Sequence, residues 1–216
     1  MGDDQVKLQR TNLRLLAASL LWLGAIGVGL GIVWQYENTP GRAAAPPQHW
    51  PTASCLEPAA DRPSLVMLAH PRCPCTRASI GELALLMAHA QGRVRASVLF
   101  YKPAGAPEAW AQTDLWQSAA AIPGVQVRLD EDGAEARHFN STTSGQVVLY
   151  DAAGRLLFHG GITGARGHSG DNEGRSAVLA LLARGAAARS QSNVFGCSLF
   201  AAPGAGQAEE VQICNQ

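Results

Sequence analysis

The stretch SLVMLAHPRCPCTRASIGEL, residues 64–83, determines which fold this chain can adopt. Its first six residues form a continuous apolar run, which is typical of a short buried strand. After it, apolar residues recur at the spacing of an amphipathic helix over residues 76–90. These are Ile80, Leu83, Leu86 and Met87. A strand that leads directly into a helix predicts an α/β fold, and two cysteines lie where the strand and the helix meet.

The junction reads HPRCPCT, residues 70–76. Pro74 suits the first turn of a helix, where its missing N–H costs nothing. Cys73 is then expected at the N-cap, with Cys75 inside the first turn. Unpaired N–H groups and the helix dipole stabilise a thiolate there and lower its pKa. We therefore predict Cys73 as the attacking thiol and Cys75, less exposed, as the thiol that resolves the exchange.

A bridge between Cys73 and Cys75 would close a small ring, and Pro74 would restrain that ring further. Strain raises the reduction potential of a disulfide. The spacing therefore favours a labile, catalytic disulfide over a structural one. Arg72 and Arg77 would add positive potential if their side chains pointed inward.

The pattern beyond residue 90 continues the alternation of strands and helices. Further strands are expected at 93–101, 125–129, 147–150 and 155–159, and helices at 108–121, 131–139 and 173–184. Strand–helix alternation implies parallel pairing with right-handed crossovers, and the hairpin at Asp151–Gly154 adds antiparallel strands. The prediction is a three-layer α/β/α sandwich with a mixed sheet, spanning residues 64–185, with Asp171 capping the last helix.

The N-terminal part predicts a membrane anchor. Residues 15–34 are uncharged and would span about 30 Å as a helix, the thickness of the hydrocarbon core. Lys7, Arg10 and Arg14 precede the run, so the positive-inside rule places residues 1–14 in the cytoplasm. The setting is then a bacterial inner membrane, with a single span and a periplasmic domain in an oxidising compartment. The proline-rich residues 35–63 are expected to act as a spacer.

Two alternatives concern this segment. Ala43-Ala44-Ala45 resembles a signal-peptide cleavage site, but it lies about ten residues past an unusually long apolar run. The GxxxG pair Gly27 and Gly31 would allow a homodimer through the membrane helix.

Composition excludes some functions. The chain has 216 residues with 17 basic and 17 acidic side chains, so nothing suggests nucleic-acid binding. No Gly-x-Ser-x-Gly elbow supports a hydrolase. Four acidic residues near the third strand are expected on a solvated face: Asp130, Glu131, Asp132 and Glu135.

A buried strand, a cysteine pair opening a helix and a later ββα unit resemble the thioredoxin-like superfamily over about 120 residues. The segments HPRCPCTRASIGEL, TSGQVVLYDAAGRLLFHGGIT, RGHSGDN and VFGCSLF are more narrowly similar to bacterial membrane-anchored thioredoxin-like proteins of the RedB type. The resemblance implies a redox role for Cys73 and Cys75, with protein thiols and disulfides as partners and a part in cell redox homeostasis.

The chain departs from the thioredoxin pattern in two ways. One residue is missing between the cysteines, since thioredoxins have Cys-x-x-Cys. Ser144-Gly145 stands where thioredoxins place a cis-proline before the fourth strand. Gly145 would still let a substrate backbone approach closely.

Several further side chains are candidates for supporting roles. His70 with Cys73 and Cys75 forms a soft ligand set that could hold copper or zinc, although alone it reads as an ordinary strand-end residue. No other cofactor is expected. In the glycine-rich loop 160–174, Arg166, His168, Asp171 and Asn172 could line the redox site, with His168 as a proton shuttle. Alternatively, Asp171 and Asn172 only cap the next helix.

The remaining cysteines leave the pairing open. Cys197 and Cys214 could bridge each other and pin the tail, residues 186–216, whose apolar patch 193–200 is expected to dock on the domain. Alternatively, Cys197 exchanges with Cys73 or Cys75. Cys55 would be free or paired with one of the tail cysteines.

The favoured function is a membrane-anchored periplasmic thiol–disulfide oxidoreductase. The first alternative is a copper or other soft-metal chaperone that uses His70, Cys73 and Cys75. The second is a redox-inert thioredoxin-like adaptor. Peroxide reduction is disfavoured, because position 70 is histidine where the peroxidase Thr-x-x-Cys arrangement has threonine.

Overall fold

The computed structural model of the protein describes residues 2–42 and 45–200. The chain forms two compact units, Met1–Asn38 and Thr39–Gln216. The first unit is one helix, α1 (Gly2–Asn38). It contains the predicted span. An 18-residue window within its segment Asn12–Asn38 has a mean hydropathy of 2.1, so this segment is long and apolar enough to cross a membrane by length and composition.

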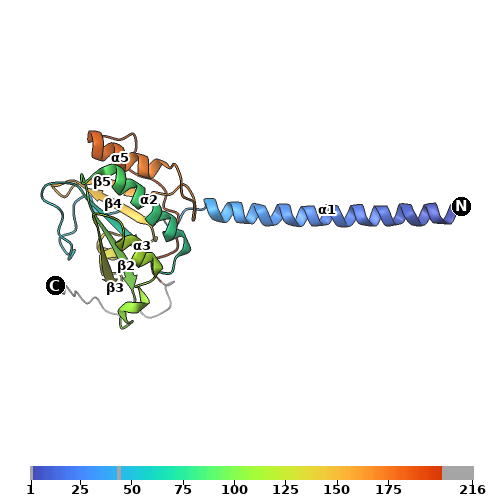
Figure 1. Cartoon of the computed structure of the whole chain (residues 1–216), viewed down its shortest axis with the longest axis horizontal. Coiled ribbons are helices and arrows are strands. Elements are labelled where there is room, and N and C mark those ends of the chain that lie inside the picture. The colour runs from blue at the N-terminus through green and yellow to red at the C-terminus, as the bar shows by residue number, and fades with distance from the viewer. Residues whose placement is uncertain (1, 43–44, 201–216) are drawn as a thin grey trace. The chain divides into compact units, whose positions relative to one another are not determined.

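The second unit is built on a five-stranded mixed sheet (Figure 1). Its strands are β1 (Ser64–Ala69), β2 (Arg95–Lys102), β3 (Val125–Glu131), β4 (Gln146–Tyr150) and β5 (Leu156–Gly160). The strand order is β3-β2-β1-β4-β5, with β1, β2 and β3 parallel and with β4 antiparallel to both β1 and β5. The predicted mixed, thioredoxin-like sheet is therefore confirmed.

Helices connect and cover the strands. They are α2 (Pro74–Ala90), the 3-10 turn η1 (Glu108–Trp110), α3 (Asp114–Ala120), α4 (Ala134–His138) and α5 (Glu173–Arg184). The predicted helix 108–121 is wrong as one element, because Thr113 has extended backbone angles and starts α3 as its N-cap. The Thr113 hydroxyl donates instead to the carbonyl of Pro71, 3.1 Å away, which ties this turn to the cysteine loop.

The sheet buries an apolar cluster on each face. One cluster packs alternate residues of β1, β2 and β4, such as Met67, Val98 and Val147, against α2, α3 and α5. The opposite cluster includes Leu68 and Val148 and is covered by α4 together with chain segments outside the helices. Leu56, Trp50, Leu199 and Phe200 belong to these covering segments.

The proline-rich segment before β1 takes part in the compact unit. Trp50 packs edge-on against Phe139 and Tyr150, with ring centroids 5.2 and 5.3 Å apart. The Tyr150 hydroxyl donates to the Pro47 carbonyl at 2.9 Å. The compact unit therefore begins at Thr39, before the predicted boundary at residue 64.

Two of the four acidic residues expected on a solvated face are buried, so that expectation is wrong for Asp130 and Glu135. The Asp130 carboxylate accepts from the backbone N–H groups of Glu135 and Ala136, at 2.8 and 3.0 Å, at the start of α4. The Glu135 carboxylate accepts from Ser54 Oγ at 2.6 Å and from the Cys55 N–H at 2.7 Å. Both carboxylates are buried because they satisfy backbone donors.

The sheet register brings three loops to one edge. Leu68 at the end of β1 pairs with Gln146 at the start of β4, and Val147 pairs with Gly160 at the end of β5. The loops that follow β1, precede β4 and follow β5 therefore meet there. These are the loops that carry the cysteine pair, Ser144-Gly145 and the glycine-rich stretch.

Candidate functional site

Cys73 lies where the sequence predicts, at the N-cap of α2, with Pro74 at the first helical position. Its backbone angles are extended (φ −89°, ψ 116°), and its carbonyl accepts the N–H of Thr76 at 3.1 Å. The Cys73 side chain does not cap the helix, so its sulfur remains available for other contacts.

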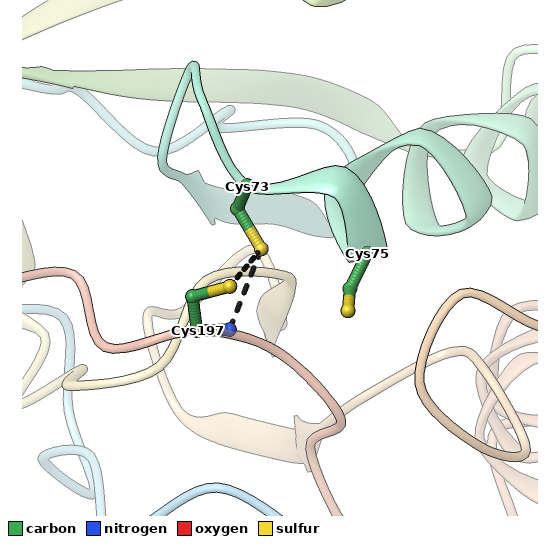
Figure 2. Close-up of side chains that lie close together, drawn as sticks. All are labelled: Cys73, Cys75 and Cys197. Carbon is green, nitrogen blue, oxygen red and sulfur yellow. Dashed lines mark hydrogen bonds between the residues drawn. The ribbon is translucent and has the colours of Figure 1, made fainter. Parts of the chain in front are cut away.

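Three free thiols meet at this point: Cys73, Cys75 and Cys197. Their sulfur atoms all lie within 4.8 Å of one another. The Cys73 and Cys197 sulfurs are only 2.8 Å apart, and the N–H of Cys197 lies 3.4 Å from Cys73 Sγ (Figure 2). The predicted pair is therefore part of a cluster of three, and its third member comes from the tail.

The predicted exposure of the pair is wrong for this conformation. Cys73 is 1% exposed and Cys75 is 6% exposed, so the expected attacker is the more buried of the two. The segment that lies against the Cys73 sulfur is the tail around Cys197. In this conformation Cys73 is therefore closed to a visiting thiol or disulfide.

Hydrogen bonds lower the pKa of the Cys73 thiol. Burial alone would raise it, but hydrogen bonds from Cys197 and Thr76 outweigh burial. The Ser144 hydroxyl accepts from the His70 N–H and lies 2.7 Å from the Thr76 hydroxyl. Ser144 thus connects the His70 backbone to the Thr76 hydroxyl, the side chain that helps to lower the Cys73 pKa.

The pKa values of the two neighbouring thiols, Cys75 and Cys197, are raised. Burial, and next the negative charge of Cys73, raise the pKa of Cys75. Burial and the contact with Cys73 raise the pKa of Cys197 to about 12. The positive charge of Arg166 opposes both shifts. Of the three thiols, Cys73 is therefore the one whose pKa is lowered, and it loses its proton before Cys75 and Cys197 do.

Replacing Thr76 by valine is expected to raise the pKa of Cys73, because the sulfur loses a donor that stabilises its charged form. The measurement is the ultraviolet absorbance of the thiolate against pH, with the Cys73→Ser titration subtracted. Thr76→Ser keeps the hydroxyl and should titrate like the parent protein. Equal Cys73 pKa values in Thr76→Val and the parent protein would contradict the assigned hydrogen bond.

Backbone pairing holds the tail beside the cluster. The Ser144 N–H donates to the Cys197 carbonyl at 2.8 Å, and the Leu199 N–H donates to the Thr142 carbonyl at 2.9 Å. Leu199 is buried, as expected for a docked apolar patch. Arg166 adds a bond from Nη1 to the Gly196 carbonyl at 2.6 Å.

Of the two alternatives for Cys197, the bridge to Cys214 is wrong, because Cys197 is a free thiol. Its contact with Cys73 agrees with the other alternative, exchange within the cluster. Cys55 is disulfide-bonded. Cys214 lies outside the described residues.

His70 lies apart from the sulfur cluster. Its ring stacks on Tyr101 and meets Trp110 edge-on, at centroid distances of 5.8 and 5.7 Å. Its Nδ1 accepts the Arg72 N–H at 3.2 Å, and burial, then the Arg72 charge, lower its pKa. Within the described residues, the group of potential metal ligands at this site consists of the three cysteines and does not include His70.

The two arginines of the motif point elsewhere. The guanidinium of Arg72 lies over the Trp110 ring, 4.5 Å from its centroid, and Arg77 pairs with Asp114 on the surface. Arg166, from the loop after β5, is instead the cation that acts on Cys75 and Cys197.

Position 145 requires glycine because of its backbone angle and its close contact with α2. Its φ is +87°, and an added Cβ would lie 2.7 Å from the Ser79 hydroxyl of α2. Its N–H donates to the Leu68 carbonyl at 2.7 Å. The close approach at Gly145 is thus with α2, and a role toward substrate stays a prediction.

The glycine-rich loop has one residue at the site and several that hold the loop. Arg166 reaches the tail, whereas His168 is exposed and its role as a proton shuttle stays a prediction. Asn172, and not Asp171, is the N-cap of α5, since its side chain accepts the Arg175 N–H at 2.8 Å. Asp171 pairs with the Arg175 side chain.

Glu82 was not predicted from the sequence as a residue that supports the site. It is fully buried on α2, where it pairs with Arg175 of α5. It also accepts from the Gly170 N–H at 2.7 Å and from Asn172 Nδ2 at 3.2 Å. A charged residue between two apolar positions of an amphipathic helix was the available signal.

No protein-family model matches the chain, and no curated protein does either. Among solved structures, the chain is similar to a hypothetical protein from Sinorhizobium meliloti, with 22% identity, a TM-score of 0.51 and coverage of 74% of this chain and 93% of that one. It is also similar to an uncharacterized conserved protein from Geobacillus kaustophilus, with 15% identity, a TM-score of 0.52 and coverage of 78% and 95%.

A lower TM-score, 0.41 at 16% identity, relates 57% of this chain to 81% of a secreted disulfide oxidoreductase from Mycobacterium tuberculosis. The likeness to the first two structures shows a shared fold. The strand order and the strand directions of the sheet are those of a thioredoxin-like fold.

Proposed function

We propose that the chain is a membrane-anchored thiol–disulfide oxidoreductase whose reactive group is the Cys73 thiolate. The observation that carries this proposal is the cluster of free thiols at the N-terminus of α2, in which hydrogen bonds lower the pKa of one member. Thiolates are the nucleophiles of disulfide exchange. Its substrates are then the thiols and disulfides of other proteins.

The anchor is the apolar segment of α1. Its length and hydropathy suit a single span, and Arg10 and Arg14 precede it. By the positive-inside rule the domain then faces the periplasm of a bacterium. An oxidising compartment supplies the disulfides that Cys73 would attack.

The test is a redox titration of the full-length protein in detergent. The protein is equilibrated in glutathione buffers, and the thiols that remain are alkylated and counted by mass. A dithiol–disulfide couple with a reduction potential above about −300 mV supports exchange, because structural disulfides are typically reduced only below that potential. This couple should be lost in Cys73→Ser. Ser118→Ala, on the exposed surface of α3, is the control variant and should keep the couple of the parent protein.

Two results would contradict exchange. A disulfide of the cluster that forms but resists all these buffers would make the domain a redox-inert adaptor. A couple that persists unchanged in Cys73→Ser would assign the chemistry to other thiols.

A second function, soft-metal binding, is favoured by one observation, the three sulfurs within 4.8 Å of one another. Thiolates select Cu(I) and Zn²⁺. The ligands would be Cys73, Cys75 and Cys197, with Cys197 in place of the predicted His70. Copper that copurifies with the reduced protein, is lost in Cys197→Ser and is kept in His70→Ala would support this function over exchange.

A further inference from the structure

We propose that Cys197, and not Cys75, is the thiol that resolves the mixed disulfide on Cys73. This inference rests on the proposed exchange function and assigns its second step. It makes the tail a working part of the site, because the residue that completes the reaction lies 124 positions along the chain from the residue that starts it.

The first argument is the direction of the side chains. Figure 2 shows the Cys73 side chain pointing at Cys197, with their sulfurs 2.8 Å apart, while the Cys75 sulfur is set off from this pair. Positions two apart at the start of a helix do not face each other. A bridge between Cys73 and Cys75 would have to close a ring across only one intervening residue, and Pro74 at that position restricts the backbone movement that closure needs.

The second argument is that backbone pairing and close packing of the tail position the Cys197 sulfur next to Cys73. Cys197 lies within an antiparallel pairing with Thr142–Ser144, through the bonds at Ser144 and Leu199. Gly196 passes so close to the Ser144 carbonyl that no side chain fits there. The buried Leu199 fixes the register on the other side of Cys197.

The chemistry balances without a further reactant. The Cys73 thiolate attacks one sulfur of a client disulfide, a bond forms between Cys73 and the client, and the other client sulfur leaves as a thiolate. Cys197 gives its proton to that departing thiolate and attacks Cys73 Sγ. The Cys73–Cys197 bond forms, and the second client sulfur leaves. The client gains two electrons, and the protein becomes its own disulfide.

The sequence of events also explains the burial of Cys73. Client and tail compete for one side of the Cys73 sulfur, so the tail leaves for the first step and returns for the second.

The test maps disulfides in the full-length protein in detergent. The reduced protein is treated with glutathione disulfide, quenched in acid, and digested with trypsin and chymotrypsin. These enzymes release residues 73–77, with both motif cysteines, and residues 196–200, with Cys197 alone. We expect these two peptides joined by a disulfide in the parent protein and in Cys75→Ser. In Cys197→Ser, the Cys73–glutathione mixed disulfide should persist at least about tenfold longer.

A bridge inside peptide 73–77, formed equally in the parent protein and in Cys197→Ser, would overturn the inference while leaving the proposed function intact. No reaction of Cys73 with glutathione disulfide in any variant would overturn both. The mapping in the parent protein requires no substitution and shows whether the two peptides are joined. Because peptide 73–77 carries both motif cysteines, the Cys75→Ser map then assigns the bridge to Cys73, and two joined peptides in the parent protein that separate in Cys75→Ser would assign the bridge to Cys75 and overturn the inference.

Discussion

Gly196→Ala is expected to open Cys73 to alkylation, with a rate about tenfold or more above that of the parent protein. A Cβ at position 196 would overlap the carbonyl oxygen of Ser144, a backbone atom held by the sheet edge. Overpacking costs about 1–3 kcal/mol. If the label reaches Cys73 only when the tail is displaced, that cost raises the reactive population about 5- to 150-fold.

The measurement is the rate of iodoacetamide labelling of Cys73 in reduced full-length protein, read by mass on peptide 73–77. Both proteins carry Cys75→Ser, so Cys73 is the single thiol of that peptide. Displacing the tail also removes the hydrogen bonds from Cys197 that lower the Cys73 pKa. Each rate is therefore divided by the thiolate fraction of that variant at the same pH.

Gly164→Ala is the matched control. An added Cβ at Gly164 meets nothing within 4 Å, in the glycine-rich loop that also carries Arg166. Its labelling rate should equal that of the parent protein. Equal rates for Gly196→Ala and Gly164→Ala would show that the tail does not cover Cys73, and the two-step role of the tail would then fail.

The local part of this site could be predicted from the sequence. The strand at 64–69, the N-cap position of Cys73 and the place of Pro74 follow from an apolar run, a proline and a helical period within twenty residues. Propensity and periodicity act over that range. The same signals give the hairpin and the last helix.

The tertiary part could not be predicted. The position of Cys197 depends on backbone pairing with Thr142–Ser144, and a short irregular strand leaves no periodic pattern. The burial of Cys73 follows from that same pairing. Asp130 and Glu135 were predicted to be surface residues. The backbone N–H groups that bind their carboxylates are brought into place only by the folded chain around α4, so the sequence pattern does not reveal them.

Glu82→Ala is expected to lower the free energy of unfolding by about 3–5 kcal/mol, the cost of removing one partner of a buried ion pair. The Glu82 side chain is wholly buried, and that of Arg175 is 13% exposed. Asp171 also contacts Arg175, but its side chain lies in solvent and compensates the charge weakly. Without Glu82, the Gly170 N–H loses its acceptor as well.

The measurement is brief proteolysis of the full-length protein in increasing urea, which reports the unfolded fraction of the domain. Glu108→Ala, an exposed carboxylate on η1, should change stability by less than about 0.5 kcal/mol. The double variant Glu82→Leu with Arg175→Met should recover most of the loss, because apolar residues of similar volume replace buried pairs at little cost.

Glu82→Ala is also expected to change the accessibility of Cys73 in the sulfur cluster. Glu82 holds the loop at Gly170 and Asn172, and the same loop carries the Arg166 bond to the Gly196 carbonyl. Cys73 should therefore be labelled faster in Glu82→Ala, in addition to the easier unfolding of that variant. A loss of less than about 1 kcal/mol, or normal labelling in a destabilised Glu82→Ala, would mean that α2 and α5 position the tail independently of this carboxylate.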